Sequence, residues 1–579
     1  MVSPNLLSKN YNQEIFEVNT DAKRIFQAVY NQVKEEKKEK EEKKDGTENI
    51  KVSELISKMA FFYEKLRNAV DYDEDHLLRK NAIFRILKRQ IIIEGVLKSI
   101  NSRDLAEHLL QELIRGSYLP NNEVPLKRID QVENILNKYL LLKNFKISKI
   151  NSDLSLKTDI KTAKDLLKEK NSSIIWLLSL AACEIEDLLG KDKIKQATVT
   201  SLFDILSQKI SLPENSPSQK DLKIQIYLSI CRTFLNLDKD MLSLVIFKYY
   251  NEAWASDMSK YKELPNQEKI QKIALNLKKL KEKIDYQLNH PLRRKLDKIT
   301  HRYSLYFSIL IDTINDEPVL KYNLLKNNPN SFFASVVKIC QKKYKKVKAK
   351  LWRASLRSII YIFLTKSIFA LVIEVPAISW FGEELSLFAL GVNISFPAIL
   401  LFLIVMATKT PNEANTKKIV EGVKEISSKK SESELEKIYI TKSKRRSRFL
   451  NGFFHVLYFL CFSLSLYAIY YVLSYLNFTW VSILIFIFFL AFVSFFSVRI
   501  TKGIKELIVV EKKESLIALL IDLFYMPIIV AGKWLSNNAS RFNVFIFVFD
   551  FIIEAPFKVL VNIAEDWTQY VKERKDNLS

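Results

Sequence analysis

The chain has 579 residues, of which 48% are hydrophobic and 27% are charged, and its net charge is +24. That length leaves room for more than one folding unit. Its 10 glycines are too far apart to form the phosphate-binding loops of nucleotide-binding proteins. Its 4 cysteines contain no C-x-x-C pair, which argues against a disulfide framework or a zinc ribbon.

Residues 1–49 form an N-terminal segment with a charged linker. The start, MVSPNLLSKNYNQEIFEV, has no positively charged stretch followed by an apolar run, so it does not resemble a secretory signal. We therefore expect this segment to stay in the cytoplasm. Residues 34–45, KEEKKEKEEKKD, carry equal numbers of lysines and acids, which predicts either a disordered linker or a solvated helix.

Residues 50–340 have the pattern of a cytosolic all-α domain. Apolar side chains recur there every three or four positions, as on one face of a helix: Val52, Leu55, Ile56, Met59, Phe62, Tyr63 and Leu66. Prolines and polar turns separate further predicted helices near 76–99, 104–115, 126–143, 162–189, 195–208, 219–236, 240–255 and 266–288. We expect one or two helical units.

A membrane domain is predicted over residues 356–513. Residues 449–498 contain no Asp, Glu, Lys or Arg, and one span needs about 20 residues, so this run predicts two spans, at 453–475 and 479–498. Two more spans are predicted at 356–375 and 387–407. The fold class is therefore all-α, with a helical cytosolic domain and a polytopic α-helical membrane domain.

The charges of the loops predict the orientation. The juxtamembrane segment 341–357 holds eight Lys/Arg and no acid, the loop 409–448 holds twelve against six acids, and 499–513 holds five against two. The loop 376–386 has two acids and no Lys/Arg. Because basic loops stay in the cytoplasm, we predict a multi-pass protein of the inner (cytoplasmic) membrane with both termini cytoplasmic. A basic cluster expected to face anionic lipid consists of Lys342, Lys343, Lys345, Lys346, Lys348, Lys350, Lys444, Arg445, Arg446 and Arg448.

Residues 514–579 are apolar but interrupted by charges. The stretch LLIDLFYMPIIVAGKWL (519–535) contains Asp522, and FIFVFDFIIEAPFKVLV (545–561) contains Asp550 and Glu554. Full spans would place basic residues outside, against the charge rule, so membrane-associated amphipathic or re-entrant helices are predicted. Whether 519–561 crosses the bilayer stays open.

Two charges lie inside the predicted span 356–375. Lys366 is near its middle, and an intramembrane cation indicates a functional site with an acid partner, for which Asp522, Asp550 and Glu554 are candidates. The alternative is a tilted or flat segment in which Lys366 reaches the headgroups. Glu374 is expected to be exposed at the outer end. Eight residues of straight helix turn by about 80° beyond two full turns, so Lys366 and Glu374 are not expected to touch.

No motif predicts catalysis or a cofactor. The 5 histidines form no H-E-x-x-H, and there is no G-x-S-x-G elbow. The acidic run DYDEDH at 71–76 lacks the later glycine and glutamate that an EF-hand needs. We therefore predict no catalytic residue, no metal site and no cofactor.

Two stretches carry a resemblance. FFYEKLRNAVDYDEDHLLRKNAIFRILKRQ (61–90) and RSIIYIFLTKSIFALVIEVP (357–376) resemble a family of large polytopic membrane proteins of small-genome bacteria. The resemblance implies a bacterial membrane protein. That family has no established activity, so the resemblance assigns no role to any residue.

The predicted function is a non-enzymatic, membrane-anchored helical scaffold whose cytosolic domain recruits a protein partner to the bilayer. One alternative is a transporter or channel that uses Lys366 with the C-terminal acids. A membrane lipid enzyme is a further alternative, without a positive signal. Anionic lipid and a protein are the expected partners. Nucleic acid is not expected, because no recognition motif accompanies the basic segments.

Overall fold

The computed structural model describes residues 16–42, 49–53, 64, 75–93, 101–155, 160–190, 192–213, 216–251, 254, 267–429, 437–440, 447–510, 516–541, 563, 567, 570–571 and 574. Nearly all of them are helical, which confirms the all-α class. The α-helices are α1 (Thr20–Glu42), α3 (Asp75–Lys88), α4 (Ser102–Arg115), α5 (Lys127–Ser155), α6 (Ile160–Leu189), α7 (Lys193–Lys209), α8 (Leu222–Thr233), α9 (Lys239–Tyr250), α11 (Gln267–Leu288), α12 (Arg293–Ile314), α13 (Pro318–Asn327), α14 (Pro329–Phe369), α15 (Val375–Trp380), α16 (Leu387–Ala407), α17 (Glu413–Ser427), α18 (Arg448–Tyr475), α19 (Trp480–Lys505) and α20 (Leu516–Arg541).

Four short elements complete the described secondary structure. Two are π-helical, η2 (Arg89–Ile93) and η4 (Ala370–Glu374). The strands β1 (Ile210–Ser211) and β2 (Ile438–Tyr439) pair in parallel, with Ile210 opposite Ile438.

The chain divides into two compact units. The unit that we call the span unit comprises Met1–Phe26, Leu305–Leu435 and Ile440–Val544. The other, called the polar unit, comprises Gln27–Ser304, Glu436–Tyr439 and Phe545–Ser579. This division falls at residues 304 and 305, inside α12, whereas the sequence places the end of the polar domain at 340.

Helices of the polar unit share one apolar core, which draws on α3 to α6, α8, α9 and α11. Helix α4 shows how the sequence builds it. Asn101 caps the helix by accepting a hydrogen bond from the Arg103 backbone N–H. The apolar stripe that follows at helical spacing is buried: Leu105, Leu109, Leu110, Leu113 and Ile114.

The described predicted helices of this region are confirmed with shifts of a few residues at their ends, except that α5 continues past the predicted end at 143 to Ser155. Most of the predicted helical stripe between Val52 and Leu66, and residues 94–99 of the next predicted helix, lie outside the described residues. Helix α1 was not predicted as a whole. It extends to Glu42, so residues 34–42 of the charged run are helical. For these residues the predicted helix is confirmed over the predicted disordered linker. Residues 43–45 lie outside the described residues.

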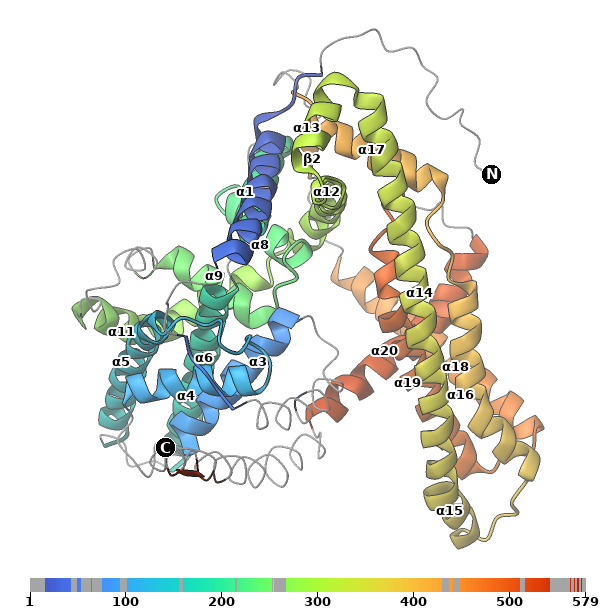
Figure 1. Ribbon diagram of the computed structural model, residues 1–579. Coiled ribbons are helices and arrows are strands. Elements are labelled where there is room, and N and C mark those ends of the chain that lie inside the picture. Colours follow the sequence, from blue (N-terminus) through green and yellow to red (C-terminus); the bar gives the residue numbers. More distant parts are fainter. Residues whose placement is uncertain are drawn as a thin grey trace. The chain divides into compact units, whose positions relative to one another are not determined.

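Among the described residues, four helices are long and apolar enough to cross a membrane: Pro329–Trp380, Leu387–Ala407, Gly452–Tyr475 and Trp480–Lys505. They match the four predicted spans, the last of which begins one residue later than predicted, at Trp480. Helices α14, α16 and α19 pack against one another, and α18 contacts α19 (Figure 1). Four such helices are consistent with a membrane protein.

Helix α20 joins this bundle, against α19 and α18. Its close approach depends on Gly532, because a Cβ there would lie 1.9 Å from the Ala491 carbonyl oxygen. The hydroxyl of Ser465 on α18 also donates to the Phe524 carbonyl at 3.2 Å. Small residues permit such contacts between helices in lipid, where backbones pack directly.

Candidate functional site

Lys366 on α14 and Glu374 at the end of η4 form an ion pair. Lys366 Nζ lies 3.7 Å from Glu374 Oε2, and both side chains are 0% exposed. The prediction that these residues do not touch is therefore wrong. Two further expectations are also wrong, because both side chains are buried: that Glu374 is exposed at the outer end, and the alternative that Lys366 reaches the headgroups.

The π-helical segment η4 brings the two charges together. Its closing bond runs from the Val375 N–H to the Ala370 carbonyl, five residues back instead of four. A π-turn holds more residues than an α-turn, so the rotation per residue falls and Glu374 comes round toward Lys366. Pro376 promotes this irregularity, because it has no N–H to donate and its ring crowds the carbonyl of Val372 within η4.

The carboxylate of Glu374 has two further partners, each on a different helix. Its Oε1 accepts hydrogen bonds from Asn393 Nδ2 on α16 and from Ser482 Oγ on α19, the latter at 2.7 Å. Asn393 Nδ2 also lies 3.4 Å from the Ser482 carbonyl oxygen. The site therefore connects α14 with η4, α16 and α19.

Ser482 stands in the first turn of α19, which begins at Trp480. Thr479 caps this end by accepting from the Ser482 N–H at 3.2 Å. The N-terminal end of a helix carries a partial positive charge, so the negative carboxylate of Glu374 is stabilised there. Glu374 lies six residues before the end of α15 at Trp380, which is about 9 Å of helix.

The ammonium group of Lys366 is covered by aromatic rings. Its Nζ lies 4.1 Å from the ring centroid of Phe489 and 5.7 Å from that of Phe369. Cations are attracted to such ring faces, most strongly away from water. Neither Lys366 Nζ nor Glu374 Oε2 has a hydrogen-bond partner within the described part of the chain. Charge balance, aromatic faces and the bonds to Oε1 therefore stabilise this pair.

The other candidate acids do not supply the partner of Lys366 among the described residues. Asp522 belongs to α20, and its side chain is not among those described. Asp550 and Glu554 lie outside the described residues.

The predicted basic cluster is divided by the structure. Lys343 turns toward α12, where its Nζ lies 2.7 Å from Asp312 Oδ2 and 2.8 Å from Ser308 Oγ. The segment 444–446 lies outside the described residues, and Arg448 begins α18. The other members are exposed on α14: Lys342, Lys345, Lys346, Lys348 and Lys350.

Sequence reasoning missed Asn393, Ser482 and Phe489. Asn393 carried a signal, because an amide inside an uncharged apolar run must find a partner within the protein. Ser482 and Phe489 are common residue types in spans and gave none. Within the described residues, no group of three or more His, Cys, Asp or Glu is placed to hold a metal ion.

In comparisons with known proteins, no family, no curated protein and no solved structure matches this chain. The resemblance to membrane proteins of small-genome bacteria therefore stays a prediction.

Proposed function

We propose that the protein is a non-enzymatic, membrane-anchored scaffold of the bacterial inner membrane, with several spans and both termini in the cytoplasm. Its polar unit would bind a protein partner, and its exposed basic residues beside the spans would contact anionic lipid. The basic loops 341–357, 409–448 and 499–513 support this orientation through the positive-inside rule.

The observation that carries this proposal is the continuous helical stretch Pro329–Trp380. It has 52 residues, of which a span needs about 20. The remaining N-terminal part, some 30 residues and about 45 Å long, is polar and basic. One helix of this kind continues from the span into a basic extension of the span unit, which is the form that a membrane-anchored scaffold would use.

The polar end of α14 is held by its neighbours within the span unit. Asn415 on α17 donates from Nδ2 to Tyr344 Oη at 3.0 Å and to the Leu507 carbonyl at 2.8 Å. Its Oδ1 accepts from the Val509 N–H at 2.7 Å. This buried amide fastens α14, α17 and the segment after α19 together, so the polar end of α14 is fixed beyond the spans.

The Lys366–Glu374 site fits the same function. It connects three helices of the anchor through hydrogen bonds whose partners all belong to the chain. A buried pair of this kind favours one arrangement of the helices, because any other arrangement separates two charges in a medium without water.

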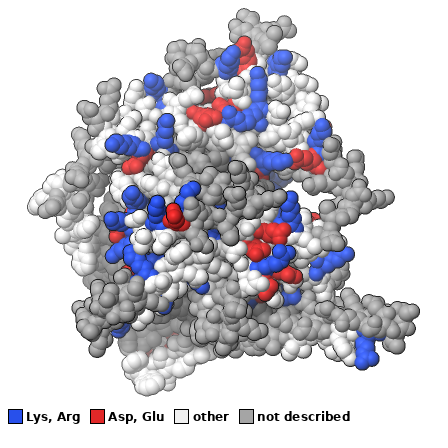
Figure 2. Space-filling view, turned by 90° about the vertical axis from the view of Figure 1, so that its left-hand side faces the viewer, with Lys and Arg blue, Asp and Glu red and all other residues white. Residues whose placement is uncertain are grey.

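The surface of the polar unit supports a protein partner. Among the described residues of the face in view, Figure 2 shows Lys/Arg side chains interspersed with Asp/Glu side chains. Nucleic acid is bound through concentrated positive charge, whereas a mixed surface suits complementary contacts with another protein.

Photo-crosslinking in living cells tests the proposal with the full chain. We would place p-benzoylphenylalanine singly at Tyr30, Tyr249, Leu275 and Tyr286, which are exposed on the polar unit. The expected result is an adduct with the same foreign protein from one or more of these positions. Tyr475, 83% exposed at the end of α18, is the control and should react with lipid. If all four positions give the same adducts as the control position, the proposed scaffold function is contradicted.

Transport is a second candidate, favoured by the complete burial of two opposite charges beside a π-helical segment. Single cysteines at 366 and 374, in a chain whose four buried native cysteines are replaced, distinguish the two functions. A scaffold predicts no reaction of either position with a membrane-impermeant maleimide. A water-filled pathway predicts reaction at both, and added ions should change its rate.

A further inference from the structure

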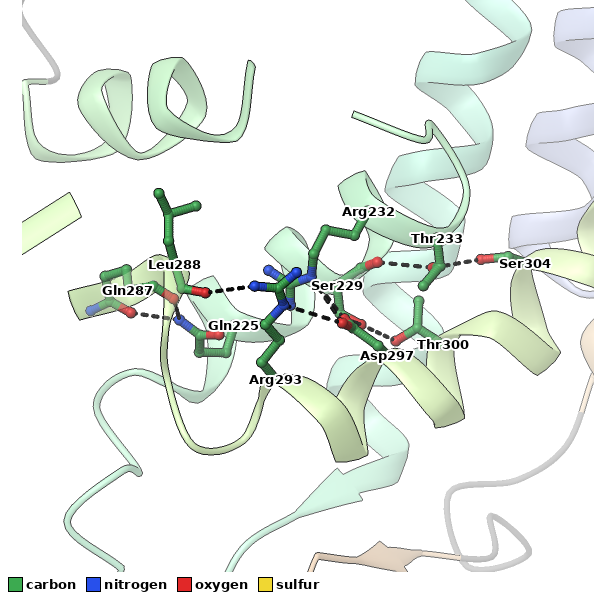
Figure 3. A network of polar contacts seen from close by, with 10 residues as sticks. All are labelled: Gln225, Ser229, Arg232, Thr233, Gln287, Leu288, Arg293, Asp297, Thr300 and Ser304. Atoms are coloured by element: carbon green, nitrogen blue, oxygen red, sulfur yellow. Dashed lines mark hydrogen bonds and ion pairs between the residues drawn. The ribbon is translucent and has the colours of Figure 1, made fainter. Parts of the chain in front are cut away.

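Two arginines meet at the junction of α8 and α12 in the polar unit (Figure 3). Arg232, near the end of α8, donates from Nε to Asp297 Oδ1 at 2.8 Å and to Oδ2 at 3.1 Å. Arg293, the first residue of α12, places its Nε 3.7 Å from Asp297 Oδ2. Two guanidinium groups thus share one carboxylate, and one positive charge is left over.

Asp297 has little capacity left for the second cation. Its Oδ1 also accepts from Ser229 Oγ at 2.9 Å. The acid Asp221 faces Gln287, whose Nε2 donates to it at 2.8 Å, and His290 at 3.6 Å, and it forms no ion pair with Arg232 or Arg293 within the described residues. Asp297 is therefore the one carboxylate that pairs with both guanidinium groups among the described residues.

Arg232 is the unusual member of the pair. Its side chain is only 7% exposed, yet neither Nη1 nor Nη2 has a hydrogen-bond partner in the described part of the chain. A guanidinium group stays charged in proteins and presents a planar fork of donors. Burying such donors without acceptors is unfavourable, so the geometry favours an acceptor from outside the chain.

Arg293 offers a way in from solvent. Its side chain is 47% exposed, and its Nη1 donates to the Leu288 carbonyl at 3.2 Å. In Figure 3 its guanidinium group lies beside that of Arg232. An anion arriving at Arg293 would therefore meet the buried fork of Arg232 next.

We propose that the α8–α12 junction binds a phosphate group, held jointly by the guanidinium groups of Arg232 and Arg293. Guanidinium forks match the oxygens of phosphate with two parallel hydrogen bonds each. A tetrahedral phosphate presents oxygens in several directions, so separate oxygens can each meet one fork, whereas chloride has no pair of oxygens to match a fork with two parallel hydrogen bonds. The group can belong to free phosphate or to a small phosphate monoester.

A titration of the purified full-length protein in detergent tests this site. Inorganic phosphate and glycerol 3-phosphate would each replace chloride at constant ionic strength. We would record the thermal unfolding midpoint and the ³¹P line width. The expected result is a saturable rise of the midpoint and broadening of the ³¹P signal. Saturation by inorganic phosphate alone assigns a free-ion site, and saturation by both assigns a monoester site.

Arg293→Gln is the decisive variant, because Arg293 is half exposed and its loss should leave the fold intact. We expect it to weaken the apparent phosphate affinity about tenfold or more, as the loss of a charge-assisted contact does. Arg294→Gln removes the same charge from the exposed neighbouring position and should bind as the unaltered chain does. If Arg293→Gln unfolds, Arg293→Lys keeps the charge, lacks the fork and should also bind more weakly. Equal binding by the Arg293 and Arg294 variants, or none by the unaltered chain, would overturn the proposal.

Discussion

At the residue scale, the pair Lys366–Glu374 has the largest electrostatic consequences, because each charge would be isolated in an apolar surrounding without the other. Removing one member of a buried ion pair costs about 3–5 kcal/mol of stability, whereas replacing both by uncharged groups of similar size is often neutral. One set of variants can compare the loss of one charge with the replacement of both charges.

We expect Lys366→Met to lower the thermal unfolding midpoint in detergent strongly. The double variant Lys366→Met/Glu374→Gln should recover most of the loss, because the new amide oxygen can still accept hydrogen bonds from Asn393 and Ser482. Lys350→Met, which removes an exposed charge from the same helix, should change little. The single variant Glu374→Gln completes the set. If the double variant loses as much stability as Lys366→Met and Glu374→Gln lose together, the ion pair does not form.

Lys366 was identifiable from sequence, but its partner was not. A charge inside an apolar run is visible in the letters, and so is the amide of Asn393. The contact with Glu374 depends on the local change from α-helix to π-helix before Pro376. A π-helical turn cannot be recognised from residue composition. The angle of about 80° between Lys366 and Glu374, calculated for a straight α-helix, was therefore wrong.

His290 gives a prediction on pH at the same scale. Burial lowers its pKa below the ordinary value, and Asp221 opposes that shift in part. The unfolded chain therefore binds a proton on this residue more readily than the folded chain does. Above the unfolded pKa of His290, about 6.5, its titration does not reduce the free energy of unfolding of the protein. That free energy falls as the pH drops from this value toward the lower pKa of the folded state.

The measurement compares unfolding midpoints at pH 7.5 and 5.5. His290→Asn, which can keep an acceptor for the Leu292 N–H, should lose less stability over this interval than the unaltered chain. His301→Gln serves as the control and should follow the unaltered chain. A pH dependence that His290→Asn leaves unchanged would show that other groups account for the acid sensitivity.

At the element scale, the contact of α20 with α19 depends on the absence of one side chain. A Cβ at Gly532 would lie 1.9 Å from the Ala491 carbonyl oxygen and 2.9 Å from Phe495 Cβ. Backbone atoms cannot rotate away as a side chain can, so the two helices must separate.

We therefore expect Gly532→Ala to destabilise the span unit by about 1–3 kcal/mol, the usual effect of overpacking. Thermal unfolding in detergent would measure the loss. Gly391→Ala on α16 is the matched control, because a Cβ there meets nothing within 4 Å. It should be neutral or slightly stabilising, since alanine favours a helix. Equal midpoints for both variants would mean that α20 does not pack on α19.

The elements that sequence predicted well are those whose apolar period is uninterrupted, such as α4 and the uncharged spans α16 and α19. Helix α17 was missed, although it buries Ile419, Val423 and Ile426 along one face. That stripe lies inside residues 409–448, which net charge had marked as a loop. Charge decides the side of the membrane on which a segment stays and is compatible with either helix or loop.

At the scale of the whole molecule, the uneven distribution of positive charge and the continuity of α14 together predict one orientation. The polar, basic end of Pro329–Trp380 and the exposed lysines of α17 belong to the cytoplasmic side if the charge rule holds. The turn between α15 and α16, with Glu383 and Glu384, then faces outward. The buried Glu374 would lie in the outer half of the bilayer, about 9 Å from that turn.

Single cysteines in the cysteine-free chain test this orientation. Glu384→Cys should react with a membrane-impermeant maleimide in cells whose cytoplasmic membrane is intact. Lys348→Cys on α14 and Lys418→Cys on α17 should react only after that membrane is permeabilised, because both are exposed on the polar side of the spans. Asn415 on α17 is hydrogen-bonded to Tyr344 on α14, so the two helices lie on the same side of the membrane. The two lysine positions should therefore give the same labelling result. Labelling of Lys348→Cys in intact cells would show that the topology is the opposite of the predicted one. It would place the extension of α14 outside the cell, and a cytoplasmic scaffold could no longer be the function of this chain.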